Sequence, residues 1–198
     1  MPVFYNPKNN KKFFYIHIPR TGGRFLVKNF IANGCIIIHP VTNKIISNLS
    51  NVREKIEGTE MIHAHQTIYE KWSSVKNVPH FTVVRDPINR FISASSRFEK
   101  NLNENKMQEW NFFNTELNKI RYDNWFKPQH EFISSKTKVW KYENGFNKNF
   151  CEWISDILSF SFIIHTVFYD PITEKRTKFK KTTPLINNIK KYYKKDWI

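Results

Sequence analysis

The segment Phe13–Leu26, FFYIHIPRTGGRFL, constrains the fold of this chain more than any other. It opens with mostly apolar and aromatic residues that favour a buried strand, and Pro19 ends that strand because proline has no backbone N–H to donate. Arg20–Gly23 then form a cationic turn with two glycines, and an amphipathic helix begins at Arg24. The backbone N–H groups of such a turn and the positive end of the helix can together bind an oxyanion. The segment therefore predicts a phosphate- or sulfate-binding loop.

This loop also has a simpler interpretation, because Pro-x-x-Gly-Gly suits an ordinary tight turn between a strand and a helix. The loop does not match G-x-x-x-x-G-K-[ST], so it is not a standard loop for a nucleotide triphosphate. It does not match G-x-G-x-x-G either, so a dinucleotide fold has no support here. A second signal is needed to separate an anion site from a plain turn.

The second signal is the segment Val83–Phe98, VVRDPINRFISASSRF. The strand His80–Val84 delivers Arg85 to its carboxyl end, which is the edge where α/β sheets bind ligands. Ser93 lies two turns into the following helix and can share a face with that edge. Arginine offers a planar fork for a phosphate and serine adds a hydroxyl donor. The alternative on these residues alone is a local ion pair between Arg85 and Asp86 that caps the helix.

Strands and helices alternate along the chain, which predicts an α/β layer fold with a parallel sheet. Further elements are expected as strands at Cys35–His39, Met61–His65 and Lys138–Tyr142, and as helices at Asn89–Lys100, Phe150–Leu158 and Pro184–Trp197. Residues 160–169 suit a strand or a hairpin arm, and residues 101–127 suit helices of undefined bounds. No internal repeat or linker is visible, so we expect one domain over residues 1–198.

Two histidines in the sequence His63-Ala64-His65 form a third constellation. On a strand, residues two apart point to the same side, so both imidazoles would lie together. An imidazole titrates near neutral pH and is therefore suited to act as a general base. A metal site and plain packing are the alternatives, although no third metal ligand is evident.

In these residues the chain resembles the sulfotransferases that use 3′-phosphoadenosine 5′-phosphosulfate (PAPS), most closely the carbohydrate group that includes heparan sulfate 2-O-sulfotransferase. The resemblance implies a P-loop-like three-layer fold with a central, mainly parallel sheet flanked by helices. It implies that the first segment binds the 5′-phosphosulfate through Arg20, Thr21, Gly22, Gly23, Arg24 and Phe25. It also implies that Arg85 and Ser93 bind the 3′-phosphate. The resemblance further implies that the reaction requires no metal.

The same resemblance assigns roles to residues outside these two segments. It makes His65 the catalytic base, with His63 as a supporting or alternative base. Arg20, with the loop amides, would stabilise charge on the bridging and sulfuryl oxygens. Near the C-terminus, Lys181-Thr182-Thr183 resembles a basic loop that covers the nucleotide. Residues 139–144 resemble the end of a later strand in the family.

Two departures from the family pattern affect the first segment. The usual lysine is Arg20 here, and a lysine ammonium is a compact charge whereas the guanidinium is a fixed fork. The hydroxyl residues expected next are Arg24 and Phe25, so two donors to the 5′-phosphate are missing. We expect these departures to affect the turnover rate more than the binding of the nucleotide.

The formal net charge of +15 favours a polyanionic partner or reflects a solvated surface rich in lysine. A basic module that binds nucleic acid or another polyanion is thus one alternative function, and a nucleotide-dependent phosphotransferase is another. We expect a glycan acceptor rather than nucleic acid. Cys35 and Cys151 show neither a disulfide framework nor metal spacing, and no signal peptide or membrane span is visible. We therefore expect a cytoplasmic protein of bacterial or viral type.

Overall fold

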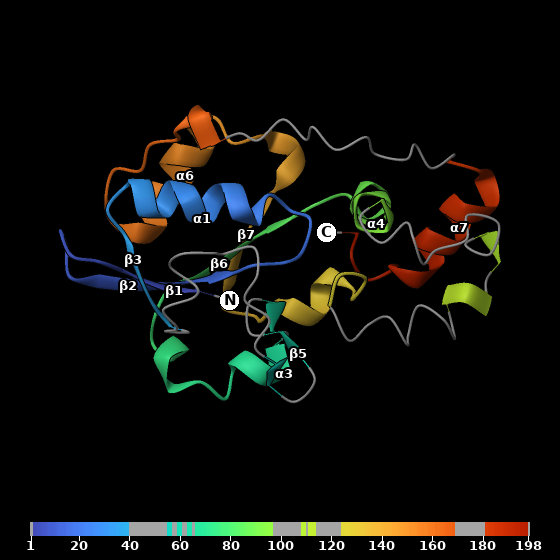
Figure 1. Ribbon diagram of the computed structural model, residues 1–198, viewed down its shortest axis with the longest axis horizontal. Helices are drawn as coiled ribbons and strands as arrows, with labels where there is room; N and C mark the ends of the chain where they lie inside the picture. Colours follow the sequence, from blue (N-terminus) through green and yellow to red (C-terminus); the bar gives the residue numbers. More distant parts are fainter. Residues whose placement is uncertain are drawn as a thin grey trace.

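A five-stranded mixed sheet forms the centre of the protein, with the strand order β3-β1-β2-β6-β7 (Figure 1). Its strands are β1 (Val3–Asn6), β2 (Lys11–Ile16), β3 (Ile36–His39), β6 (His80–Val84) and β7 (Thr137–Lys141). The strands β2, β6 and β7 run parallel, whereas β1 pairs antiparallel with both β2 and β3. A separate antiparallel pair is formed by β4 (Lys55–Ile56) and β5 (Thr59–Glu60). This computed structural model describes residues 2–39, 55–56, 59–60, 63–64, 66–96, 108–109, 111–113, 124–168 and 181–197.

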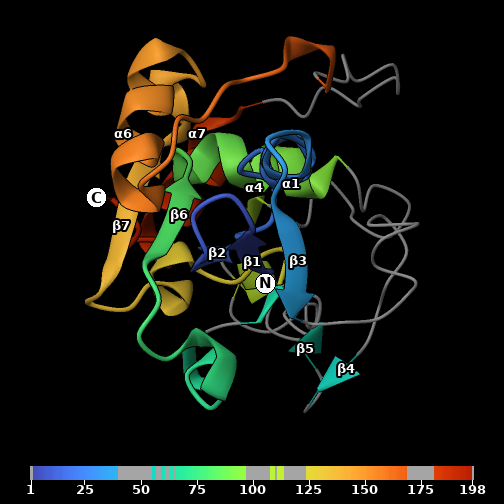
Figure 2. The same ribbon diagram turned by 90° about the vertical axis from the view of Figure 1, so that its left-hand side faces the viewer.

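The helices cover both faces of the sheet and its carboxyl edge. They are α1 (Gly23–Ala32), α3 (Gln66–Tyr69), α4 (Pro87–Ser95), α6 (Lys148–Leu158) and α7 (Thr183–Tyr192). Short 3-10 helices lie between them: η2 (Ser73–Val75), η7 (Gln129–Phe132), η8 (Tyr142–Asn144) and η9 (Thr166–Phe168). In Figure 1, α1 and α6 lie above the sheet, α3 lies below it, and α4 and α7 lie beyond the carboxyl ends of the parallel strands. Figure 2 shows the same arrangement of helices and sheet after a turn of 90° about the vertical axis.

Alternation along β2 divides the core into two layers, because successive side chains of a strand point to opposite faces. Phe13 and Tyr15 pack with α1 and α6 in one cluster of buried aromatic and aliphatic side chains. Phe14 and Ile16 pack in a second cluster with Tyr69 and other residues of the opposite face. The sheet is therefore buried on both sides, which confirms the predicted α/β fold with helices flanking a central sheet.

The predicted elements near the two anion motifs are confirmed with small shifts. The strand His80–Val84 has the predicted bounds, and β2 begins and ends two residues earlier than expected. The helix α4 begins at Pro87, where a proline needs no donor, and Asp86 caps it by accepting a hydrogen bond from the N–H of Asn89 at 2.8 Å.

The strand predicted over residues 160–169 is wrong for residues 160–168, and the predicted strand Met61–His65 is not found at His63 and Ala64, the two of its residues that the structure describes. His63 lies in a 3-10 turn rather than a strand, and its carbonyl accepts a hydrogen bond from Nδ2 of Asn124 at 2.8 Å. Residues 160–165 form no strand, and three of their N–H groups bond to side chains of α1, of the residue that follows α1, and of α6. These bonds are Phe162 N–H to Ser155 Oγ, Ile163 N–H to Asn33 Oδ1 and His165 N–H to Asn29 Oδ1. Such bonds satisfy the backbone without a sheet partner.

Candidate functional site

The two predicted anion motifs meet at the carboxyl edge of the sheet, because β2 and β6 are adjacent parallel strands. The first loop, residues 17–22, connects β2 to α1, and the second loop, residues 85–86, connects β6 to α4. Parallel strands that end side by side and lead into helices place both helix N-termini at the same edge. A polyanion with two negative ends can therefore contact both loops.

The first loop is shaped by two glycines that are needed for different reasons. Gly22 caps α1 in the left-handed region with a φ of 88°, and a Cβ there would lie 2.9 Å from the ring of Phe146. Gly23 has no room for a side chain, because a Cβ would overlap the imidazole of His17. Thr21 is buried, and its hydroxyl donates to the carbonyl of Ile18 at 2.8 Å. The Thr21 hydroxyl thus shapes the loop.

Arg20 joins the first loop to α4. Its Nε donates a hydrogen bond to Oγ of Ser93 at 3.0 Å, and its guanidinium carbon lies 5.3 Å from the centre of the Trp125 ring. The residue adopts a φ of 69°, which is uncommon for a residue with a side chain and favours a constrained turn. The Ser93 side chain is buried within α4. Two residues predicted for opposite ends of the nucleotide are therefore in direct contact.

Arg85 points from the second loop towards the first. Its Nη1 donates to the carbonyl of Arg20 at 3.3 Å, and its guanidinium carbon lies 4.7 Å from the centre of the Tyr142 ring. Asp86 is used in the cap of α4, so the carboxylate beside Arg85 has its own structural role. The structure thus brings together Arg20, Arg85 and Ser93.

His63 lies near this cluster and packs against two aromatic rings. Its ring centre is 4.8 Å from that of His17 and 6.3 Å from that of Trp125. Burial lowers the pKa of His63 to about 3, and the positive charge of Arg90 adds to that effect. Burial also lowers the pKa of His17 well below its usual value of 6.5, with His63 as the next cause. Both imidazoles are therefore neutral at physiological pH. His65 lies outside the described residues.

The other predicted residues of the first motif lie on the first turn of α1. Arg24 is exposed. Phe25 stacks on Phe146 with ring centres 5.5 Å apart and packs against the core under α1 and α6. Phe25 therefore contributes packing where the family pattern has a hydroxyl.

The predicted basic loop leads into α7 and reaches α4. Nζ of Lys181 donates to Oδ1 of Asn89 at 3.1 Å, at the first turn of α4. Thr182 is the N-cap of α7, and its hydroxyl is buried with no hydrogen-bond partner among the residues that the structure describes. Thr183 is exposed as the first residue of α7. The Lys181 contact places this segment beside the helix that carries Ser93.

Arg90 and Trp125 are site residues that the sequence motifs did not assign. Arg90 is only 1% exposed, and its guanidinium donates to the carbonyls of Pro19 at 3.0 Å and Trp125 at 3.1 Å. It thereby fixes the first loop to the segment that carries Trp125, and Trp125 in turn contacts both Arg20 and His63. The second arginine of RDPINR was the available signal for Arg90, whereas nothing local pointed to Trp125.

The assembled site suits an anion with more than one phosphate or sulfate group. Two guanidinium groups, a hydroxyl and a helix N-terminus surround one edge, and a neutral imidazole pair lies beside them. Among the described residues, no group of three or more His, Cys, Asp or Glu side chains could hold a metal ion. In the same part of the chain, no helix is both long enough and apolar enough to cross a membrane.

Comparison with known families agrees with the two motifs. A family model described as "Sulfotransferase family" matches residues 2–197, which is nearly the whole chain. Neither a search of curated proteins nor a search of solved structures gave a match.

Proposed function

The chain belongs to the sulfotransferase family, and we propose that it transfers a sulfuryl group from PAPS to a hydroxyl group of a saccharide. The observation that carries the proposal is the contact of Arg20 with both Ser93 and Arg85, which joins the two motifs into one site. The saccharide acceptor rests on the resemblance of the motifs to the carbohydrate group. The transfer itself follows from the family.

The residues present fit the donor by their chemistry. Arg85 supplies a charged fork and Ser93 a hydroxyl for the 3′-phosphate. The first loop supplies Arg20 and the start of α1 for the 5′-phosphosulfate, with the close approach that Gly22 and Gly23 permit. Lys181 adds a third positive charge from the segment that reaches α4. Each anionic end of the donor therefore has at least one cation assigned to it.

The donor supplies an activated sulfuryl group whose bond to the bridging oxygen breaks as the acceptor oxygen attacks. The task of Arg20 is to donate hydrogen bonds to oxygens that gain negative charge in the transition state. The contacts of its Nε with Ser93 and of its guanidinium with Trp125 hold that fork at the site. Because positioning and electrostatics supply most of the rate in such transfers, a rigid fork is useful here.

A histidine accepts the proton of the acceptor hydroxyl. The resemblance favours His65 for this role, and His63 is the alternative that the structure describes. A pKa of about 3 keeps His63 neutral and able to accept a proton, although it also makes the unliganded imidazole a weak base. An anionic donor held beside it would raise the pKa of His63, because a nearby negative charge favours the imidazolium.

A stepwise experiment tests the donor and then the acceptor. Thermal shift is measured with adenosine 3′,5′-bisphosphate, with adenosine 5′-monophosphate and with Mg-ATP. Stronger stabilisation by the bisphosphate supports the donor site, whereas preferential stabilisation by Mg-ATP would indicate a phosphotransferase. Sulfate transfer from PAPS is then measured with a panel of glycans and small alcohols. Transfer to small alcohols alone would reject the saccharide acceptor, and salt-sensitive oligonucleotide binding without transfer would favour a polyanion-binding module.

A further inference from the structure

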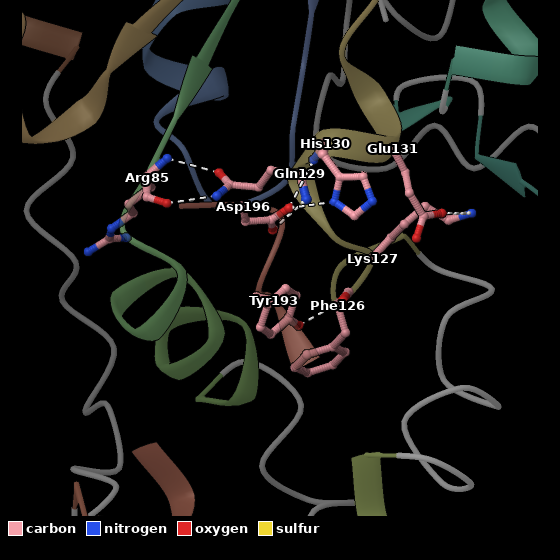
Figure 3. A network of polar contacts seen from close by, with 8 residues as sticks. All are labelled: Arg85, Phe126, Lys127, Gln129, His130, Glu131, Tyr193 and Asp196. Atoms are coloured by element: carbon pink, nitrogen blue, oxygen red, sulfur yellow. Dashed lines mark hydrogen bonds and ion pairs between the residues drawn. The ribbon is translucent and has the colours of Figure 1, made fainter. Parts of the chain in front are cut away.

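The side-chain amide of Gln129 bonds to both backbone groups of Arg85 (Figure 3). Its Oε1 accepts from the N–H of Arg85 at 2.9 Å, and its Nε2 donates to the carbonyl of Arg85 at 2.8 Å. Gln129 is fully buried. Arg85 is the first residue after β6, whose last pairing with β7 joins Val84 to Lys141. The amide therefore satisfies both backbone groups of the first residue beyond the end of β6.

Gln129 is itself held by the carboxylate of Asp196. Oδ2 of Asp196 accepts from the N–H of Gln129 at 2.7 Å, and Oδ1 accepts from the N–H of His130 at 3.0 Å. Oδ1 also lies 2.8 Å from Nδ1 of His130. These N–H groups begin the 3-10 helix η7, whose N-cap residue, Pro128, makes no side-chain cap bond. Asp196 thus supplies the helix cap from 67 residues further along the chain.

The segment that carries Asp196 is anchored to the same stretch by a second bond. The hydroxyl of Tyr193 donates to the carbonyl of Phe126 at 2.7 Å, and the N–H of Asp196 donates to the carbonyl of Tyr193 at 2.8 Å. Both Tyr193 and Asp196 are buried. Figure 3 shows the side chain of Gln129 reaching towards Arg85, with Asp196 beside Gln129 and His130, and Tyr193 beside Phe126. A continuous chain of hydrogen bonds therefore runs from the C-terminal segment to the backbone of Arg85.

This chain of hydrogen bonds affects anion binding by Arg85. The guanidinium can bind an anion only if the backbone of Arg85 holds it in the right place. A displacement of the Arg85 backbone would move Nη1 away from the carbonyl of Arg20 and the guanidinium away from Tyr142. Bidentate contacts with a phosphate depend strongly on such placement.

We propose that Gln129 and Asp196 are positioning residues for anion binding by Arg85, so that the C-terminal segment forms part of the nucleotide site. The proposal rests on the proposed function, since it takes the 3′-phosphate of the donor as the ligand of Arg85. Neither residue needs to touch the nucleotide. Their contribution passes through the backbone of Arg85 alone.

The test compares two ligands that differ only in the 3′-phosphate. Dissociation constants for adenosine 3′,5′-bisphosphate and adenosine 5′-monophosphate are measured by calorimetry. The ratio of the monophosphate constant to the bisphosphate constant isolates the contribution of the 3′-phosphate. The first variant is Gln129→Met, which keeps the length of the side chain but removes its hydrogen bonds. The second is Asp196→Asn, which is a smaller change because the amide keeps one of the two acceptor oxygens. Each is also made in an Arg85→Ala background, because the combined variant reveals whether the two residues act through Arg85.

Asn33→Ala is the matched control. The amide of Asn33 forms the same two-bond bridge to a backbone, that of Ile163, with Nδ2 to the carbonyl at 2.8 Å and the N–H to Oδ1 at 3.0 Å. Asn33 is the residue that follows α1, at the end of that helix away from the first loop. Asn33→Ala also removes two hydrogen bonds between a side chain and a backbone. The variant should therefore lower the melting temperature without changing the ratio of dissociation constants.

The expected result is that Gln129→Met lowers the ratio by about fivefold or more, the equivalent of losing one neutral hydrogen bond, and leaves affinity for the monophosphate nearly unchanged. The Asp196→Asn variant should shift the ratio in the same direction by less. Neither change should lower the ratio further when Arg85 is already alanine. If Gln129→Met fails to fold, Asp196→Asn carries the same comparison.

The proposal is overturned if the ratio stays at the wild-type value, if both ligands lose affinity equally, or if the losses add to that of Arg85→Ala. A wild-type protein with no preference for the bisphosphate would overturn the proposed function first, and this inference with it. A wild-type preference that Arg85→Ala removes and Gln129→Met leaves intact would overturn this inference alone.

Discussion

Nε of Arg20 donates a hydrogen bond to Oγ of Ser93 at 3.0 Å, so the first loop and α4 meet through two side chains. A serine hydroxyl that accepts a hydrogen bond still has its own proton to donate. Ser93 can therefore receive the bond from Arg20 and donate to a phosphate oxygen at the same time. The contact gives Arg20 a part in orienting Ser93 as well as a part in charge stabilisation.

Arg85→Ala should weaken binding of adenosine 3′,5′-bisphosphate much more than Ser93→Ala. The arginine forms a charge-assisted contact of roughly 1.5–3 kcal/mol, whereas a neutral hydroxyl contributes about 1 kcal/mol. Calorimetric titration of the two variants checks the order. Equal losses, or no loss for Arg85→Ala, would reject the assignment of the 3′-phosphate to these residues.

Arg20→Lys tests the unusual residue of the first loop. If Arg20 replaces the usual lysine, nucleotide affinity should stay within a few-fold and turnover should be kept or raised. Arg20→Ala should lower turnover far more than affinity, because the charge matters most when the bridging oxygen becomes negative. Steady-state sulfate transfer and nucleotide binding are measured for both variants. If the lysine variant is as inactive as the alanine variant, then the geometry of the guanidinium, including its bond to Ser93, is what the reaction needs.

The parts of the fold that could be predicted from the sequence are those whose signal is local. The strand His80–Val84 was predicted with its bounds, because a short apolar run is followed at once by a charged residue and a proline-started helix. The strand β1 was missed, since four residues before a polar turn carry little pattern. The antiparallel pairs formed by β1 were missed with it, and they make the sheet mixed rather than parallel.

The parts of the site that could not be predicted depend on partners far away in the chain. Trp125 reaches Arg20 and His63 only through the tertiary fold. The bonds of Asp196 to Gln129 and His130 join residues more than sixty positions apart. Side chains that bond to a distant backbone leave no periodic pattern in the sequence. The sequence therefore indicates the two motifs but not the residues that hold them in place.

Gly23→Ala should destabilise the protein because a methyl group would overlap the imidazole of His17. That imidazole has little freedom to move, since it stacks on Tyr15 with ring centres 5.7 Å apart and contacts His63. Overpacking of this kind costs roughly 1–3 kcal/mol. Urea unfolding measures the loss.

The double variant Gly23→Ala with His17→Ala identifies the cause of that loss. If the clash with His17 is responsible, the double variant should lose less free energy of unfolding than the two single variants lose in sum. Strict additivity would instead place the cost of Gly23→Ala in the backbone of the helix start.

Acid should destabilise the wild-type protein partly through His63. Its pKa is about 3 in the folded protein and near the ordinary histidine value of 6.5 in the unfolded chain, so between these values the unfolded chain binds a proton that the folded chain does not. The free energy of unfolding therefore falls as the pH falls below about 6.5, by no more than about 1.4 kcal/mol per pH unit for one histidine.

His63→Gln removes this contribution, so the unfolding free energy of the variant should depend less steeply on pH between about 5 and 6.5. His17 keeps its own contribution of the same sign in the variant, which leaves a residual slope. Urea unfolding of both proteins across that pH range gives the difference, and equal slopes would mean that His63 is solvated and protonates freely in the folded protein.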